Sequence, residues 1–318
     1  MTENSFTTLN LNKWERDFLE QSIWKSLPNE VDYIISIPEE IVIYFKSLLT
    51  HLDTTSETIY KDFSDLNVKY KSSSPVWVQS WLRSLEYKIT YSPLFFVVRW
   101  WDMLGLNFLK QKLFYLWIWE YLWMLDYQKW PFYEVYDRWG TYDKHQRYSD
   151  TRLSLGYHTD STQKDNLPKY IWLLCIEQSR VWWESKLLNM SNIYRTMMND
   201  FLLELKILQT KYFRDSTKKE NAYPVFEWMN GKLVFRYMRR WIEIGYESLG
   251  MTLPPEKKEA IDVLENCMVH EAFPLEFKMQ VGDILFFDNT ILAHDRTEFD
   301  DDWISKRLLI RTWVYSAI

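Results

Sequence analysis

Two short polar stretches, separated by more than a hundred residues, constrain most strongly what this chain can fold into. The first, residues 156–160, contains His158 and Asp160, and the second, residues 288–294, ends at His294. On an extended backbone, residues two apart project to the same face, with Cα atoms about 6.6 Å apart. Two such side chains can close on one metal ion. His294 offers a third ligand, so a fold that uses all three has to bring distant segments together.

This set of side chains matches one kind of metal site. Two histidines and one carboxylate, with coordination positions left open, form the facial triad of non-haem Fe(II) oxygenases. A His-x-Asp triplet by itself is more often structural, so the interpretation depends on the rest of the chain. Two arginines, Arg307 and Arg311, follow the third candidate ligand and supply further polar chemistry.

Length and charge exclude several classes of protein. The 318 residues can form one large domain or two small ones. A net charge of −6 and a pI near 5.5 offer no basic surface for a polyanion, so we expect no nucleic-acid partner. The N-terminus lacks a basic segment followed by an apolar run, and charged Glu120 interrupts the apolar segment 113–125. We therefore expect neither a secretory signal nor a membrane span.

The cysteines favour a reducing compartment. Cys175 and Cys267 are the only two in the sequence, and they lie far apart without CxxC spacing. This pattern argues against a disulfide framework or a structural zinc site. We expect a cytoplasmic protein.

Hydrophobic patterning predicts helices early in the chain and many short strands later. Residues 10–90 have mostly helical spacing, and a Lys-rich loop is expected at 211–222. Further helices are expected at 106–125, 191–210, 238–249 and 255–268. Strands are expected at 93–99, 132–136, 170–176, 185–188, 233–237, 273–278, 284–287, 290–293 and 308–315. This pattern predicts an α+β protein with a mainly β core, a sandwich or jelly roll.

The order of the motifs carries a specific resemblance. The chain contains, in sequence, His158-x-Asp160, Glu184-Ser185, Gly-Asp-Ile-Leu-Phe-Phe-Asp-Asn at 282–289, His294-x-Arg296-Thr297-x-Phe299 and Arg307-x-x-x-Arg311. In this order it resembles the taurine dioxygenase-like family, which includes γ-butyrobetaine hydroxylase and clavaminate synthase. The resemblance runs from about Phe95 to Val314, and residues 1–90 contain no motif that we can place.

The resemblance implies a fold and a domain organisation. The fold is a double-stranded β-helix, or jelly roll, with flanking helices. We expect a single oxygenase domain over residues 1–318. Residues 1–90 would be a mostly helical N-terminal extension, and residues 91–318 the jelly-roll core with a helical insert at about 190–270.

The resemblance also implies an activity. Members of the family are Fe(II)- and 2-oxoglutarate-dependent dioxygenases, so we expect iron held by His158, Asp160 and His294, with 2-oxoglutarate and O2 as co-substrates. The enzyme would hydroxylate an unactivated C–H bond of a small polar metabolite, such as an amino acid or a derivative, and release succinate and CO2. Iron carries the reaction while the protein supplies orientation and excludes water.

The family pattern implies further binding residues for 2-oxoglutarate. Its distal carboxylate would bind Arg307, with the hydroxyl of Ser185 beside it, and Arg311 would lie near the carboxylate next to the metal. The two arginines alternate onto one face of a strand, with stems about 13 Å apart, which suits two different carboxylates. Guanidinium groups pair with carboxylates through two hydrogen bonds, which explains arginine rather than lysine.

Several alternatives stay open. The same cofactors can support desaturation, epoxidation or ring closure in secondary metabolism, and the protein could instead be a non-catalytic jelly-roll binding protein. Arg296 fits either a role beside His294 or a surface salt bridge. Arg236 fits either substrate contact or a structural role. The oligomeric state cannot be read from the sequence.

The glycine and tryptophan contents are abnormal. The sequence has 7 glycines and 18 tryptophans, whereas glycine usually makes up roughly 7% of a chain. Trp182 and Trp183 stand where the family usually has a Gly-Gly turn, and tryptophan is a poor replacement for glycine at a turn. One hypothesis is that UGA codons read as glycine by the source organism were translated as tryptophan; the alternative is an aromatic-rich lineage. The candidate positions are Trp100, Trp117, Trp119, Trp123, Trp130, Trp172, Trp182 and Trp183.

Overall fold

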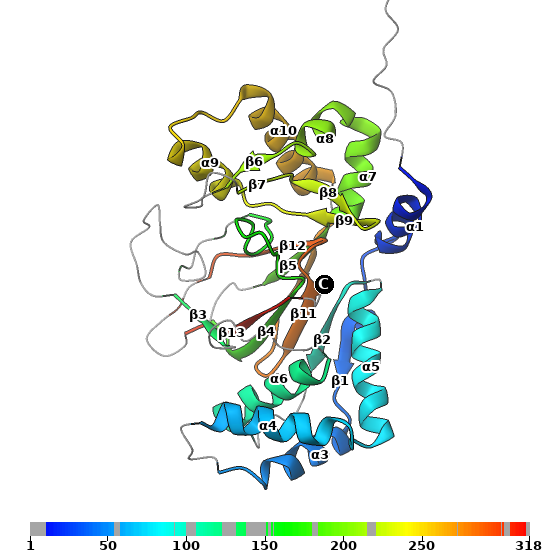
Figure 1. Ribbon diagram of the computed structural model, residues 1–318, viewed down its shortest axis with the longest axis vertical. Coiled ribbons are helices and arrows are strands. Elements are labelled where there is room, and N and C mark those ends of the chain that lie inside the picture. Colours follow the sequence, from blue (N-terminus) through cyan, green and yellow to red (C-terminus); the bar gives the residue numbers. More distant parts are fainter. Residues whose placement is uncertain are drawn as a thin grey trace, which may run out of the picture.

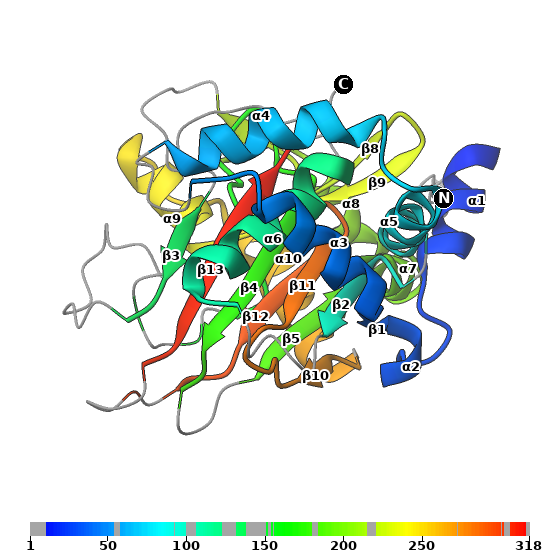
Figure 2. The same cartoon turned by 90° about the horizontal axis from the view of Figure 1, so that it is seen from below.

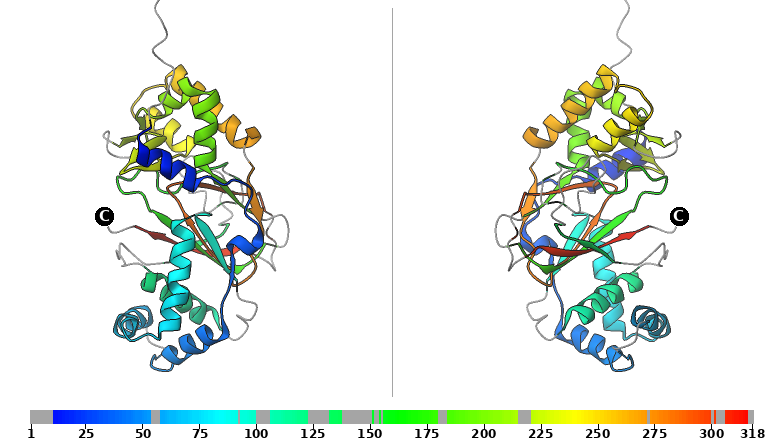
Figure 3. Two further views of the ribbon diagram at one scale, coloured as in Figure 1. Left: turned by 90° about the vertical axis from the view of Figure 1, so that its right-hand side faces the viewer. Right: turned by 90° about the vertical axis from the view of Figure 1, so that its left-hand side faces the viewer.

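A computed structural model shows a mixed helix-and-sheet protein, with helices gathered at both ends and sheets between them (Figures 1 and 3). The α+β prediction is therefore confirmed at this level. The structure describes residues 11–53, 58–91, 93–99, 106–122, 132–137, 151, 154, 156–179, 184–214, 221–271, 273–299, 301 and 306–315.

The larger sheet has six strands within the described residues, in the spatial order β1, β2, β11, β4, β13, β3. Their bounds are β1 Ile34–Ser36, β2 Phe95–Arg99, β11 Ile284–Asp288, β4 Tyr170–Glu177, β13 Leu308–Val314 and β3 Tyr133–Val135. β1 runs parallel to β2, and the other neighbours are antiparallel. Figure 2 shows β4 between β11 and β13, so strands from the middle and the end of the chain form the centre of the sheet.

Alternate residues of this sheet enter two separate cores. On β2, Phe95 and Val97 belong to one core, and Phe96 and Val98 to the other. Successive side chains of a strand point to opposite faces, so a strand covered on both sides needs apolar residues at every position. The buried run of β2 meets this requirement.

The smaller sheet places the third candidate ligand. β5 (Ser185–Asn189) lies between β10 (Leu275–Phe277) and β12 (Leu292–Arg296), and both pairings are antiparallel. Its inward residues, among them Leu187 and Leu292, share the first core with β2. The two sheets therefore face each other across that core.

Helices α3 to α6 cover the outer face of the larger sheet, at the bottom of Figure 1, whereas α1 lies beside β9 (Lys232–Phe235). A cluster of aromatic rings, including Phe45, Phe114 and Trp117, fills the second core beneath them. The helices before β2 and after it are α1 Lys13–Ser22, α2 Glu30–Tyr33, α3 Glu39–Leu49, α4 Ile59–Lys71, α5 Val76–Thr90 and α6 Phe108–Leu122. None of the helices in the described part of the chain combines the length and apolar character needed to cross a membrane.

A second group of elements, between β5 and β10 in sequence, lies at the top of Figure 1. It contains α7 Met190–Asp200, α8 Leu202–Leu208, β6 Tyr212–Phe213, β7 Ala222–Tyr223, β8 Phe226–Met229, β9 Lys232–Phe235, α9 Arg239–Ser248, α10 Pro255–Asn266 and a π-helical turn at Cys267–Glu271. β6 pairs with β7 and β8 with β9. These elements lie at the opposite end of the molecule from α3, α4 and α6 (Figure 1).

Two sequence expectations were wrong in detail. The expected loop at 211–222 contains β6 and the start of β7, because strands of two residues have too little periodicity to detect. The strand that carries His294, β12, begins at Leu292 and not at Thr290 as predicted. Residues 288–290 form a turn instead, in which Oδ1 of Asp288 accepts from the main-chain N–H of Thr290 at 2.8 Å.

Candidate metal centre

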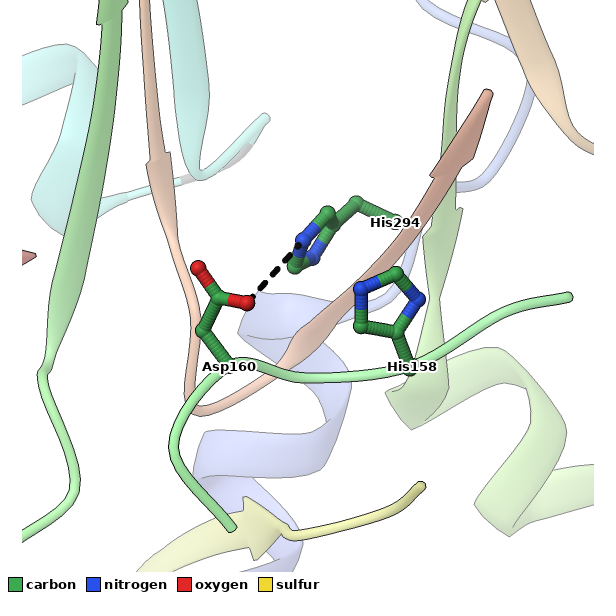
Figure 4. Close-up of side chains that lie close together, drawn as sticks. All are labelled: His158, Asp160 and His294. Carbon is green, nitrogen blue, oxygen red and sulfur yellow. Dashed lines mark ion pairs between the residues drawn. The ribbon is translucent and has the colours of Figure 1, made fainter. Parts of the chain in front are cut away.

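The structure brings His158, Asp160 and His294 together. One potential ligand atom from each lies within 4.8 Å of the other two (Figure 4). The main chains of His158 and His294 exchange two hydrogen bonds, of 3.0 Å and 2.9 Å, in an antiparallel bridge. β12 therefore delivers the third ligand to the first pair, as the spacing of the sequence required.

Main-chain contacts around Asp160 fix the position of the triplet. The Asp160 N–H donates to Oδ1 of Asn289 at 2.8 Å, and the Asn289 amide donates to the carbonyl oxygens of Asp160 and Pro168. Thr159 bonds through its N–H to the carbonyl of Tyr237 at 2.8 Å. The segment is thus held between the turn before β12 and the segment after β9.

The histidines present nitrogen atoms suited to a metal. Nδ1 of His158 lies 2.9 Å from the carbonyl oxygen of Gly156, which can only accept, so Nδ1 carries the proton and Nε2 is left as a ligand. Nε2 of His294 faces Oδ1 of Asp160 at 3.9 Å, the contact dashed in Figure 4. Nδ1 of His294 is buried and has no hydrogen-bond partner among the described residues.

Protonation states also suit metal binding. Burial raises the pKa of Asp160, but the positive charge of Arg311 and the two histidines outweigh it and bring the pKa down to about 2. Burial, helped by His158, lowers the pKa of His294 to about 3. At neutral pH the carboxylate is ionised and the imidazole is neutral, which are the forms that bind metals. The donor set, its burial and its charge fit one divalent ion.

Arg311 and Trp313 hold the other oxygen of the carboxylate. Nη1 of Arg311 lies 3.1 Å from Oδ2 of Asp160, and Nε1 of Trp313 donates to the same oxygen at 2.8 Å. The Arg311 guanidinium also lies between the rings of Tyr133 and Trp313, about 5 Å from each. Arg311 therefore lies at the metal end of the site.

Arg307 and Ser185 lie beside residues of the segment 296–301. Arg307 is 4% exposed, its N–H donates to Oδ1 of Asp301 at 3.0 Å, and its guanidinium carbon lies 5.2 Å from the centre of the Phe299 ring. Burial, and then the nearby Arg296, lowers the pKa of Arg307 well below its usual value. Ser185 is buried on β5, directly opposite Arg296 on β12.

The structure shows the contacts of Arg296 and Arg236, whose roles the sequence left open. Arg296 packs its guanidinium on the Phe299 ring and donates to the carbonyl of Thr151. Arg236 is buried and donates to the carbonyl of Lys164 at 2.6 Å, with longer bonds of 3.5 Å to the carbonyls of Thr162 and Asp165 in the loop after Asp160. These contacts favour the structural alternative for Arg236.

Sequence reasoning gave no role to two residues of the centre, Asn289 and Trp313. Asn289 stood in the Asp-Asn turn, where its side chain was read only as turn chemistry. Trp313 is two residues after Arg311 and so shares its strand face, and this alternation is the one signal of its position. Neither pattern indicates a contact with Asp160, which depends on how β13 lies against a distant loop.

The mixed fold and the buried His-Asp-His cluster define a protein built to hold one metal ion on one side, with the remaining coordination positions open. The family model "Taurine catabolism dioxygenase TauD, TfdA family" matches residues 95–313. The chain belongs to this family, which confirms the family predicted from the motifs.

One curated relative is FR-33289 synthase of Streptomyces rubellomurinus (strain ATCC 31215), which is 26% identical over 176 residues. The match covers 52% of this chain and 50% of the relative, so the chain spans about half the length of the curated protein it matches.

Solved structures of similar fold include asparagine oxygenase with Fe(II), 2S,3S-3-hydroxyasparagine and succinate, at a TM-score of 0.65 and 15% identity. Another is the non-haem iron oxygenase OrfP with Fe and alpha-ketoglutaric acid, at a TM-score of 0.61 and 16% identity. Each covers 89% of this chain and 94% of the other. At these identities the likeness is one of fold.

Proposed function

We propose that this protein is an Fe(II)- and 2-oxoglutarate-dependent dioxygenase that hydroxylates an unactivated C–H bond of a small polar metabolite, such as an amino acid or its derivative. The observation that carries the proposal is the convergence of His158, Asp160 and His294 in a chain of the TauD/TfdA family. The similar folds of asparagine oxygenase and OrfP, solved with iron and with succinate or alpha-ketoglutaric acid, support the same class.

The three ligands would hold the iron on one side. When bound, the iron supplies the redox chemistry that couples loss of CO2 from 2-oxoglutarate to oxidation of a C–H bond by O2, with succinate as the other product. The protein's own part is to keep Asp160 ionised and His294 neutral, and to fix both through main-chain hydrogen bonds to buried partners.

Arg307 would bind the distal carboxylate of 2-oxoglutarate, with Ser185 beside it. A buried guanidinium carries a desolvation cost that a carboxylate in bidentate contact can offset. The low exposure of Arg307 and its depressed pKa support this assignment, because burial disfavours its charge and a bound carboxylate would stabilise that charge. Arg311 would lie near the other carboxylate of 2-oxoglutarate, the one next to the metal. Its Nε is buried without a partner among the described residues.

We also propose that the chain is a single jelly-roll domain over 1–318, with a helical N-terminal extension at 1–90 and a helical insert at about 190–270. Two facing sheets and the insert between β5 and β10 support this division. β1 pairs with β2, which ties the N-terminal extension into the larger sheet. Two free, buried cysteines are consistent with a cytoplasmic location.

The test is release of succinate from 2-oxoglutarate by purified protein with Fe(II), ascorbate and a panel of small polar metabolites. We expect slow succinate release without a substrate and a clear stimulation by at least one amino acid or derivative. Hydroxylated product, and not an alkene, epoxide or ring, distinguishes hydroxylation from the other oxidative outcomes. Absence of turnover with every metabolite and without one would favour a non-catalytic binding protein.

A further inference from the structure

Trp313 contacts only one of the two carboxylate oxygens of Asp160, the candidate metal ligand. The indole Nε1 donates to Oδ2 of Asp160 at 2.8 Å, and Nη1 of Arg311 lies 3.1 Å from that same oxygen. Oδ1 faces Nε2 of His294 at 3.9 Å. One oxygen is therefore occupied by two N–H donors, and the other points toward the remaining ligands.

The indole ring is held so that its single N–H has one direction. Nζ of Lys164 lies 4.9 Å from the ring centre, and the guanidinium carbon of Arg311 lies at the same distance. The main chain of Trp313 is paired with Ile171 in the central strand β4. An indole offers one donor and no acceptor, so its bond to Asp160 cannot be exchanged for another arrangement of the same ring.

We infer that Trp313 is a positioning residue that keeps Asp160 as a ligand through one oxygen only. A carboxylate with two unoccupied oxygens can bind a metal through both, and the second bond would close a coordination position that 2-oxoglutarate or O2 needs. Trp313 makes the shorter of the two hydrogen bonds to Oδ2, 2.8 Å against 3.1 Å from Arg311, and without it Oδ2 is free to turn toward the metal. The inference rests on the proposed function, because it takes the triad as the site of the metal.

The experiment compares Trp313→Phe with the wild-type protein, using Mn(II) bound to metal-free protein as a spectroscopic probe. The number of exchangeable waters on Mn(II) is counted by electron paramagnetic resonance in oxygen-isotope-labelled water. We expect one water fewer in Trp313→Phe, and a 2-oxoglutarate Kd about 10-fold higher, in the range typical of outer-shell partners. Trp228→Phe is the matched control, because it removes an indole N–H that donates to the hydroxyl of Tyr194 at 3.0 Å, in the insert.

A second pair of variants isolates the N–H donor from the ring. Trp313→Gln keeps a donor, whereas Trp313→Met has nearly the same length and no donor. We expect Gln to retain the wild-type water count and Met to lose one water, and this pair decides the question if the Phe variant does not fold. Equal water counts in Gln, Met and wild type would overturn the inference. Failure of the wild-type protein to bind Mn(II) would instead count against the proposed function.

Discussion

Two buried charged groups of the site, the carboxylate of Asp160 and the guanidinium of Arg307, differ in how their surroundings affect their charge. Asp160 has its own cation and indole donor within the chain, Arg311 and Trp313, and its pKa falls to about 2 despite burial. Arg307 is equally buried, yet burial and the neighbouring Arg296 depress its pKa. Asp160 therefore keeps its charge despite burial, whereas burial disfavours the charge of Arg307, which an anion bound there would stabilise.

Strand β13 and the residue before it contribute to both parts of the site. β13 supplies Arg311 and Trp313 to the metal end, and Arg307 directly precedes it. A metal ion would meet a prearranged ligand set, so little reorganisation is needed on binding. Binding of 2-oxoglutarate would gain most from the desolvated cation, since charge-assisted hydrogen bonds are strongest where water is excluded.

Removal of a metal ligand should have the largest effect. Asp160→Ala deletes the only carboxylate of the triad, so we expect the affinity for Fe(II) or Mn(II) to fall by more than about 100-fold, beyond the usual cost of losing an outer-shell partner. Calorimetric titration of metal-free protein measures it. Asp165→Ala is the control, because this acid lies on the same loop but bonds to Tyr223. Metal affinity unchanged in Asp160→Ala would remove the basis of the assignment.

Substitution of Arg307 should weaken the binding of 2-oxoglutarate without changing the binding of the metal. Arg307→Ala removes the buried cation, and we expect the KM for 2-oxoglutarate to rise at least 30-fold, corresponding to about 2 kcal/mol. Metal affinity should stay near the wild-type value. Lys306→Ala, one residue away and exposed, should leave the KM unaltered. A loss of metal affinity in Arg307→Ala as large as that in Asp160→Ala would contradict separate roles for Arg307 and Asp160.

Arg236 tests whether the loop carrying Asp160 is prearranged. Arg236→Ala leaves the carbonyls of Thr162, Lys164 and Asp165 without this donor, so we expect a loss of about 2 kcal/mol in unfolding free energy. Urea unfolding measures the loss. Tyr223→Phe keeps the ring that packs 4.0 Å from the guanidinium and should cost less. A larger loss in Tyr223→Phe than in Arg236→Ala would contradict this account of the loop.

The last prediction concerns the stability of the metal-free protein as a function of pH. The pKa of His294 falls from 6.5 to about 3 on folding, so between these values the unfolded chain takes up a proton that the folded chain refuses. Stability should therefore decrease as pH falls below about 6.5. His294→Leu should flatten this slope, and His51→Ala, at an exposed site, should not. Identical slopes in the wild type and His294→Leu would be the contrary result.

The meeting of the three candidate ligands could be predicted from the sequence, whereas their surroundings could not. The convergence of His158, Asp160 and His294 could be predicted because their residue types and order are read along the chain, and β2 and β11 because their apolar runs are continuous. The strand β1 was missed, because its three residues lie within a stretch of helical spacing. The contact of Trp313 with Asp160 could not be predicted, because it is set by the packing of β13 against a loop about 150 residues earlier.

The tryptophan hypothesis remains a prediction. Trp117 and Trp172 are fully buried and pack against aromatic neighbours, and Nε1 of Trp119 is buried without a partner among the described residues. Trp182 and Trp183, the strongest candidates, lie outside the described residues, as do Trp100, Trp123 and Trp130. Peptide masses of the protein from its source organism decide the matter. Glycine masses at 182 and 183 support the hypothesis, and UGG codons there exclude it.

The central claim is that this chain binds iron and 2-oxoglutarate together at His158, Asp160 and His294. The most direct measurement is anaerobic addition of Fe(II) and then 2-oxoglutarate to metal-free protein, followed by visible absorption. Chelation of iron by a keto acid produces a charge-transfer band, so we expect a band that requires both additions and that Asp160→Ala abolishes. Absence of the band in the wild type, or its persistence in Asp160→Ala, would contradict the claim.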